Sequence, residues 1–307
     1  MNYLKIELTA AALLIFSLAR SQQISVDFPK LSDHYLGQKP PGLIPELFAP
    51  GIISTDQYEL NSIFSKDGTE FYYCISTTTK EEKAEGIYFY KVMFTKLVNG
   101  YWTKPERTPF SGENMTVDIS FSPDGNRLFY CTDKLVSEES EGLDIWYVER
   151  NGSGWSDPVS LGSPINSTFG ETQPTFTDDG TIYFPSAREG TGADIYYSKL
   201  VAGSYDEPVK LSGSINTEYG EGNSFIAPDE SYILFARWGM PEEMYGGKGL
   251  FISFRKDDDT WTEARHIEEE TGMCGSLAAL SPDGKYLFYS CDGDIFWVDA
   301  GVVNKLK

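Results

Sequence analysis

Short apolar runs separated by polar turns recur five times along this chain of 307 residues. In each copy, one apolar run ends at a turn that carries an Asp, usually followed by Gly, and a second apolar run begins directly after it. The turns lie at Asp67-Gly68, Asp124-Gly125, Asp179-Gly180, Asp229-Glu230 and Asp283-Gly284. Successive Asp residues are 57, 55, 50 and 54 positions apart. A period of this size predicts a repeat fold in which each unit packs against its neighbours.

Each copy predicts four antiparallel strands. The Asp-Gly turn predicts a hairpin, because Gly takes the positive φ that closes such a turn. After a variable polar stretch comes a third run rich in aromatic and β-branched residues, such as 144–147 and 194–197, which suit a half-buried strand. A fourth run starts at an aromatic residue followed three positions later by Pro, as at Trp102, Trp155 and Tyr205. Pro cannot donate to a central ladder, so this run is expected at the edge of a four-stranded propeller blade.

The connection that precedes an inner strand indicates how the ring closes. Similar phrases of seven residues stand before the first, third and fourth copies, at 53–59, 165–171 and 215–221. Residues 43–53 therefore resemble an outer strand with no blade in front of it, while the last copy ends near Asp299, soon after its third strand. We expect the N-terminal strand to complete the last blade, which removes an open sheet edge; Val302-Val303 is the alternative. The predicted fold is all-β, a five-bladed β-propeller of four-stranded antiparallel blades over 43–307, closed by an N-terminal outer strand.

The first 21 residues have the pattern of a signal peptide. Lys5 precedes an apolar run from Ala10 to Leu18, and Ala19-Arg20-Ser21 follows it. An apolar core of this length before small residues is typical of an export signal rather than of a membrane span. We expect a signal peptide at 1–21 with cleavage after Ser21 (Ala19 is the alternative), an N-terminal arm at 22–42, and no membrane span. The mature protein is then periplasmic or secreted.

Charge narrows the range of partners. The chain has 25 Lys and Arg residues against 46 Asp and Glu residues, a formal net charge of −21. Affinity for nucleic acid and for anionic membranes depends on basic residues, so neither is expected as a partner. The sequence contains no EF-hand loop and no Gly-Asp-rich metal repeat. We therefore expect no cofactor and no metal site, calcium binding has no motif to support it, and we expect a soluble monomer.

Four cysteines raise the question of disulfides in an exported chain. Cys74 and Cys131 each lie six residues after the Gly of their turn, and the matching positions of the other copies carry small residues. Equivalent side chains of successive blades point in the same sense around the ring, so these two are predicted to be buried free thiols. Cys274 and Cys291 lie on the two arms of the fifth hairpin, close to opposition. The sequence leaves open whether they form a disulfide.

The third copy is similar to a known repeat. It carries Pro164-Ile165-Asn166-Ser167, Glu171, an Asp-Gly hairpin before Tyr183-Phe184, Arg188 and Asp194-Ile195-Tyr196. This sequence resembles the TolB-type, WD-repeat-like β-propeller repeat of exported bacterial proteins. The resemblance extends over all five copies and is weaker in the fourth, where Glu230 replaces Gly. Because that family serves mainly in protein–protein or ligand binding and shares no catalytic set, the resemblance implies a binding function and assigns no catalytic residue.

Polar residues at the starts of the inner strands form the candidate site. Eight residues before each turn Asp stand Glu59, Thr116, Glu171, Glu221 and Gly275, and six before it stand Asn61, Asp118, Gln173, Asn223 and Leu277. Alternate residues share one strand face, so both sets should point towards one mouth of the central channel. The loops above this mouth bring Asp133, Lys134, Arg188, Arg237, Trp238 and Asp292. The pattern predicts a site for an envelope or secreted protein, or for a small polar ligand, made by Glu59, Asn61, Asp118, Glu171, Gln173, Glu221, Asn223, Arg188, Arg237 and Trp238.

Three other interpretations of these residues stay open. In the first, the Glu side chains hold neighbouring backbone and Arg188 pairs with one of them. In the second, the protein is a carbohydrate-active hydrolase of the five-bladed glycosidase type, whose acid and base or nucleophile come from Glu59, Asp118, Glu171 and Glu221. In the third, the propeller is a structural scaffold of the envelope. The chain has two His residues, His34 and His266, so neither a His-based metal site nor a Ser-His-Asp arrangement is predicted.

Overall fold

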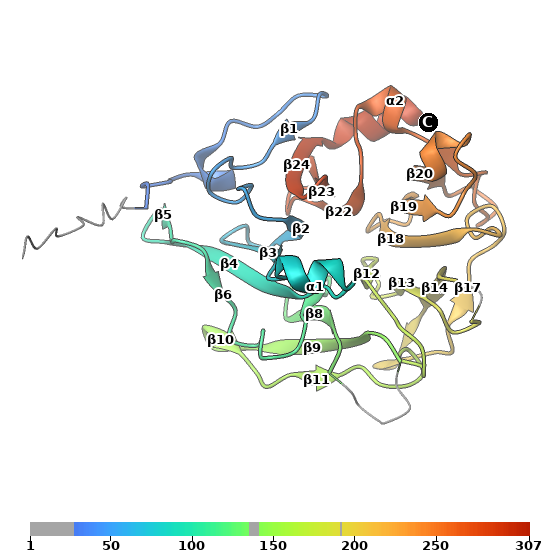
Figure 1. Ribbon diagram of the computed structural model, residues 1–307, viewed down its shortest axis with the longest axis horizontal. Helices are drawn as coiled ribbons and strands as arrows, with labels where there is room; N and C mark the ends of the chain where they lie inside the picture. Colours follow the sequence, from blue (N-terminus) through green and yellow to red (C-terminus); the bar gives the residue numbers. More distant parts are fainter. Residues whose placement is uncertain (1–27, 135–140, 191) are drawn as a thin grey trace, which may run out of the picture.

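Five large antiparallel sheets stand around a central axis in the computed structural model of the chain, with one small separate hairpin in the third (Figure 1). The structure describes residues 28–134, 141–190 and 192–307. Each large sheet is one blade of a propeller, with four strands in its main ladder and the inner strands of neighbouring blades in contact at the centre. The predicted five-bladed propeller is therefore confirmed. The predicted signal peptide lies outside the described residues, and no helix among the residues described is long and apolar enough to cross a membrane.

The blades follow one another along the chain. Blade 1 contains β2 (Glu59–Phe64), β3 (Glu70–Ser76), β4 (Tyr90–Val98), β5 (Tyr101–Trp102) and β6 (Glu106–Arg107). Blade 2 contains β7 (Val117–Phe121), β8 (Arg127–Thr132), β9 (Asp144–Asn151), β10 (Gly154–Trp155) and β11 (Val159–Ser160). Blade 3 contains β12 (Thr175–Phe176), β13 (Ile182–Ser186), β14 (Asp194–Ser198) and β17 (Val209–Lys210), with a hairpin of β15 (Leu200–Val201) and β16 (Ser204–Tyr205).

The last two blades and the short helices complete the ring. Blade 4 contains β18 (Gly220–Ile226), β19 (Tyr232–Trp238), β20 (Lys248–Phe254) and β21 (Arg265–His266). Blade 5 contains β22 (Ser276–Leu280), β23 (Tyr286–Cys291), β24 (Asp294–Asp299) and β1 (Glu46–Leu47). The helices are η1 (His34–Gly37), α1 (Lys80–Ala84), η2 (Tyr245–Gly247), α2 (Glu268–Thr271) and η3 (Ala300–Leu306).

The N-terminal strand closes the ring, as predicted. β1 pairs with β24, with Glu46 opposite Trp297, and Figure 1 shows the N-terminal segment beside the C-terminal blade. The strand is shorter than the predicted 43–53, because the backbone turns left-handed at Ala49 (φ 42°) and Gly51 (φ 75°). Phe48, fully buried beyond β1, packs edge-on against Trp297 with ring centroids 5.2 Å apart. The alternative closure is wrong, since Val302 and Val303 lie buried in η3.

The repeated turns owe their shape to their Asp and Gly residues. Gly125 has a φ of 75°, and Asp124 accepts hydrogen bonds from the Ser122 hydroxyl (2.6 Å) and the Asn126 N–H (3.0 Å). These donors hold the pKa of Asp124 below its usual range. In the fourth turn Glu230 takes the left-handed position, with a φ of 57°. The Asp-Gly repeat is therefore an element of local folding.

Aromatic residues fill the space between blades. Tyr72 of blade 1 meets Phe121 of blade 2 edge-on, with centroids 5.6 Å apart, and Phe129 of blade 2 packs on Phe176 of blade 3 at 4.6 Å. Such rings bury large apolar areas, which makes them the main contribution to blade-to-blade packing. Cys74 and Cys131 are buried free thiols, as predicted.

Candidate functional site

The blades give the molecule two distinct faces. The Asp-Gly turns end the inner strands, and the side of the molecule that carries them is called the turn face below. The opposite side, where the inner strands begin, is called the start face. Because neighbouring strands of a blade are antiparallel, the loops from the second to the third strand also lie on the start face. These loops include 77–89, which contains α1, and 239–247, which contains η2.

The three Glu side chains at the inner-strand starts are buried and paired. Glu59, Glu171 and Glu221 are each at most 1% exposed. Each accepts hydrogen bonds from the N–H and the hydroxyl of the residue four positions earlier: Thr55, Ser167 and Thr217. Burial raises the pKa of Glu59 above its usual value, although the Thr55 donors oppose this. The carboxylates thus fold the connection from one blade to the next.

Two Arg side chains complete this arrangement in blades 3 and 4. Arg237 Nε donates to Glu221 at 2.7 Å, and its Nη2 donates to the carbonyl of Ile215 at 2.9 Å. Arg188 repeats the pattern, with Nη2 2.6 Å from the carbonyl of Ile165 and 3.4 Å from Glu171 Oε1. Each Arg therefore binds both the carboxylate and the start of the same connection. This geometry favours the interpretation in which these residues support the fold.

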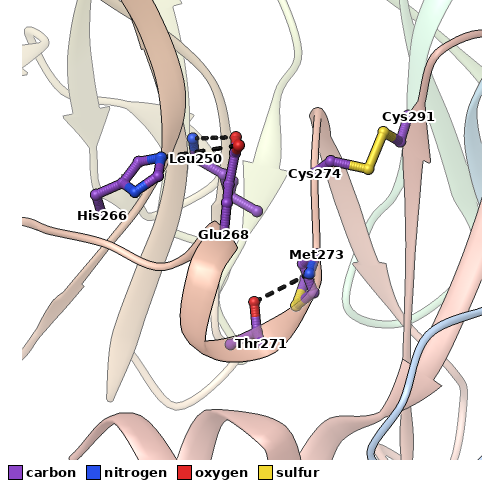
Figure 2. The surroundings of a disulfide bond; sticks show 7 residues. All are labelled: Leu250, His266, Glu268, Thr271, Met273, Cys274 and Cys291. Carbon is purple, nitrogen blue, oxygen red and sulfur yellow. Dashed lines mark hydrogen bonds and ion pairs between the residues drawn. A yellow bond between two sulfur atoms is a disulfide. The ribbon is translucent and has the colours of Figure 1, made fainter. Parts of the chain in front are cut away.

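Blade 5 makes the same connection with a covalent bond. Gly275 takes the place of Glu, and by the register of β22 and β23 it lies opposite Cys291, where blade 4 has Arg237. Cys274, the preceding residue, forms a disulfide with Cys291 (Figure 2). A Cβ on Gly275 would lie 2.0 Å from the carbonyl oxygen of Ser290, so only Gly fits beside this bond. The disulfide that the sequence left open is present and replaces the carboxylate.

The second set of predicted residues lies at a bend in the inner strands. All five have positive φ, between 36° and 62°: Asn61, Asp118, Gln173, Asn223 and Leu277. Four of the inner strands have a β-bulge or register shift at this point. A bulge interrupts the alternation of side chains, so the two sets do not follow the simple two-residue pattern that the prediction used. The sequence signal for these bends was Asn or Asp at the position, because these residues tolerate left-handed backbone.

Side chains at these bulges connect one blade to the next. Asn61 Oδ1 accepts the N–H of Ile119, Asp118 Oδ2 accepts the N–H of Gln173 at 3.3 Å, and Asn223 Nδ2 donates to Ser276 Oγ at 3.0 Å. Burial raises the pKa of Asp118 to about 6. Asn61 and Gln173 also border a cavity that opens towards the turn face.

The remaining predicted residues lie on the start face. Trp238, 40% exposed, lies over Gly220 and Gly222 of β18, where an added Cβ would fall 2.4 and 2.7 Å from the indole. Asp133 accepts the N–H of Met115 at 2.8 Å, and the Lys134 ammonium lies 4.5 Å from the centroid of the Trp146 ring. Within the described ranges, no group of three or more His, Cys, Asp or Glu side chains is arranged to hold a metal ion.

Sequence reasoning identified Trp238 but missed the aromatic surface on the start face to which it belongs. Among the described residues, six aromatic side chains are strongly exposed, and all but Tyr101 lie on this face: Tyr58, Tyr88, Phe169, Trp238 and Tyr245. Exposed Ile87 and Met244 lie in the same loops. Tyr245 stacks on His266 with ring centroids 3.9 Å apart. Tyr58 and Phe169 stand in the repeated connections at 53–59 and 165–171, whereas Tyr88 and Tyr245 stand in loops that do not repeat, where no repeat alignment could find them.

No family model and no curated protein matches the sequence. Several solved structures have a similar fold. A "putative TolB" from Agrobacterium tumefaciens is 15% identical, with 80% of this chain and 78% of that chain covered and a TM-score of 0.49. A protein of unknown function from Dyadobacter fermentans is 12% identical over 86% and 84%, with a TM-score of 0.47. An α-L-arabinofuranosidase from Lactobacillus brevis is 15% identical over 64% and 72%, with a TM-score of 0.42. These likenesses assign no activity to the chain.

Proposed function

We propose that this propeller is a protein-binding module whose partner docks on the start face. The observation that carries the proposal is the concentration of exposed aromatic residues there, five of the six strongly exposed aromatic side chains of the described chain. Soluble monomers leave few large apolar side chains together at the surface without a partner. Tyr and Trp are also the residues that contribute most to protein–protein affinity.

The aromatic residues are held in place by their surroundings, which supports a binding role. The Trp238 indole packs on Gly220 and Gly222, which have no side chain to displace it, and the Tyr245 ring stacks on His266. A side chain that is already ordered loses less conformational entropy on binding, so such residues suit an interface.

The buried carboxylates favour binding over hydrolysis as the proposed function. A glycosidase needs two carboxyl groups that face a substrate. Glu171 and Glu221 instead accept hydrogen bonds from their own connection and from Arg188 and Arg237. The same internal pairing speaks for a protein partner rather than a small polar ligand at these side chains.

We also propose that the module works outside the cytoplasm, in the periplasm or as a secreted protein. The Cys274–Cys291 disulfide supports this location, because such bonds persist in oxidising compartments. The expected signal peptide at 1–21 agrees with it and is tested by N-terminal sequencing of the exported protein.

Binding by paired variants tests the start face. Immobilised wild-type protein captures its partner from an extract of the native cells, and the affinity of the purified partner is then measured. We expect Tyr88→Ala/Trp238→Ala to weaken binding by at least about 30-fold, since one strong interface residue contributes about 2 kcal/mol. Tyr101→Ala is the matched control, because Tyr101 is an equally exposed aromatic residue on the turn face. Equal affinity of the double variant and the control would contradict the proposal.

A further inference from the structure

A cavity of about 250 Å³ lies in the central channel and opens on the turn face. All five blades line it with large apolar side chains, among them Ile63, Phe121, Phe176, Phe225 and Leu280. The volume is several times the roughly 30 Å³ that one water occupies in the liquid. It is smaller than most pockets for drug-sized molecules. The cavity therefore has the size for one long side chain or a small organic ion.

The inner end of the cavity is rich in hydrogen-bond acceptors. Gln173 is 1% exposed, and its Oε1 receives no hydrogen bond from any described residue. Asn61 Oδ1 accepts one N–H, from Ile119, and an amide oxygen can accept two. Ser120 and Thr175 add hydroxyl oxygens to the same lining. A buried acceptor without a donor is costly, so this end favours a ligand that brings N–H groups.

Charged side chains, most of them carboxylates of the repeated turns, stand around the outer end. The lining residues at the mouth are Lys66, Pro123, Asp178, Pro228 and Pro282. Each is followed by the Asp of its turn: Asp67, Asp124, Asp179, Asp229 and Asp283. The carboxylate of Asp178 lies at the mouth itself. Lys66 is the cation among the lining residues, and its ammonium is held 2.7 Å from the carbonyl of Pro123, while Lys285 pairs with Asp283 at 2.9 Å. Because the chain as a whole has a formal net charge of −21, its field favours the approach of cations to the mouth.

We propose that this cavity binds a primary alkylammonium group, either a free amine or a lysine side chain of a bound protein. The ammonium donates to Gln173 Oε1 and its neighbouring oxygens, and the alkyl chain lies along Phe121, Phe176 and Phe225. A metal cation or a water molecule has no apolar surface to bury against these walls, whereas an alkyl chain does. The inference goes beyond the proposed function and uses the opposite face of the molecule.

Calorimetric titration of the whole protein tests the inference. The probes are n-pentylammonium and Nα-acetyl-lysine methylamide, which separate a free amine from a lysine side chain. Pentan-1-ol and potassium chloride at equal concentrations test the alkyl chain and the charge alone. We expect saturable binding of at least one ammonium probe, and at least tenfold weaker binding of pentan-1-ol and of potassium. Heat from potassium alone, or no heat from either ammonium probe at millimolar concentration, would overturn the proposal.

Variants assign the binding to the cavity. Gln173→Leu keeps the size of the side chain but removes the acceptor, so we expect at least tenfold weaker binding, the cost of one hydrogen bond to a charged group. Asn126→Leu, an exposed change on the same face, is the control. Chemical-shift changes of the Gln173 side-chain amide in the wild type give a second measurement that needs no variant. Unchanged affinity in Gln173→Leu, or shifts that avoid Gln173, would refute the assignment.

Discussion

Asp118 makes the stability of this propeller depend on pH in a way that one substitution removes. Its carboxyl is buried in blade 2 beside the thiols of Cys74 and Cys131 and accepts a single weak hydrogen bond, from the N–H of Gln173 at 3.3 Å. Burial raises the pKa of Asp118 to about 6, from an unfolded value of about 3.9. The folded state therefore holds this proton more tightly than the unfolded state does.

The sign and size of the effect follow from that difference. The stability contributed by the proton is complete below about pH 4 and is lost as the pH rises through 6. A difference of about two pKa units, at roughly 1.4 kcal/mol each, costs the wild type about 3 kcal/mol at pH 8. Asp118→Asn carries no charge at any of these pH values. Asn also suits the position, because Asn61 and Asn223 occupy the same left-handed site in blades 1 and 4.

Urea unfolding of both proteins between pH 4 and pH 8 measures the effect. We expect the free energies of unfolding to be nearly equal at pH 4 and to differ by about 3 kcal/mol in favour of Asp118→Asn at pH 8. Asp178→Asn, which changes an exposed carboxylate, is the control and should follow the wild type. A difference that stays constant with pH, or a less stable Asp118→Asn at pH 8, would refute the reasoning.

Three further predictions concern the start face and its supports. Gly222→Ala places a Cβ 2.7 Å from the Trp238 indole, so we expect the indole to move and its fluorescence spectrum to shift. The free energy of unfolding in urea should fall by about 1–3 kcal/mol. An unchanged spectrum would contradict the close contact. Cys274→Ser/Cys291→Ser removes a disulfide whose cysteines are 17 residues apart, and it should lower the free energy of unfolding by about 3 kcal/mol. Cys74→Ser, at a free thiol, is the control for the loss of a sulfur atom. Equal losses in the two variants would argue against a stabilising role for the disulfide. Glu221→Ala leaves the Arg237 guanidinium buried without its carboxylate, so we expect the free energy of unfolding to fall by about 3–5 kcal/mol. The double variant Glu221→Ala/Arg237→Ala should recover part of this loss. No recovery in the double variant would argue against the pairing.

The fold could be predicted from the sequence because the same turn and strand pattern recurs in every blade. Asp124-Gly125 and its counterparts mark every hairpin, and the surplus connection at 53–59 indicated the N-terminal closure that β1 makes. The bulge at Asn61 was not predicted, because a one-residue insertion leaves no trace in a hydrophobic pattern. The cavity was missed for a related reason. Its walls come from five blades, and their convergence is a property of the closed ring.

The candidate site illustrates how repetition misleads a search for function. Glu59, Glu171 and Glu221 drew attention because they recur, yet each blade uses its Glu to fold its own connection, and blade 5 does the same with a disulfide. A residue that recurs because it folds the blade gives no evidence of a ligand. A ligand or partner, in contrast, meets a surface without fivefold symmetry, so its contacts are expected where one blade departs from the others. Trp238 on its two glycines and Gln173 with its unpaired oxygen are such departures.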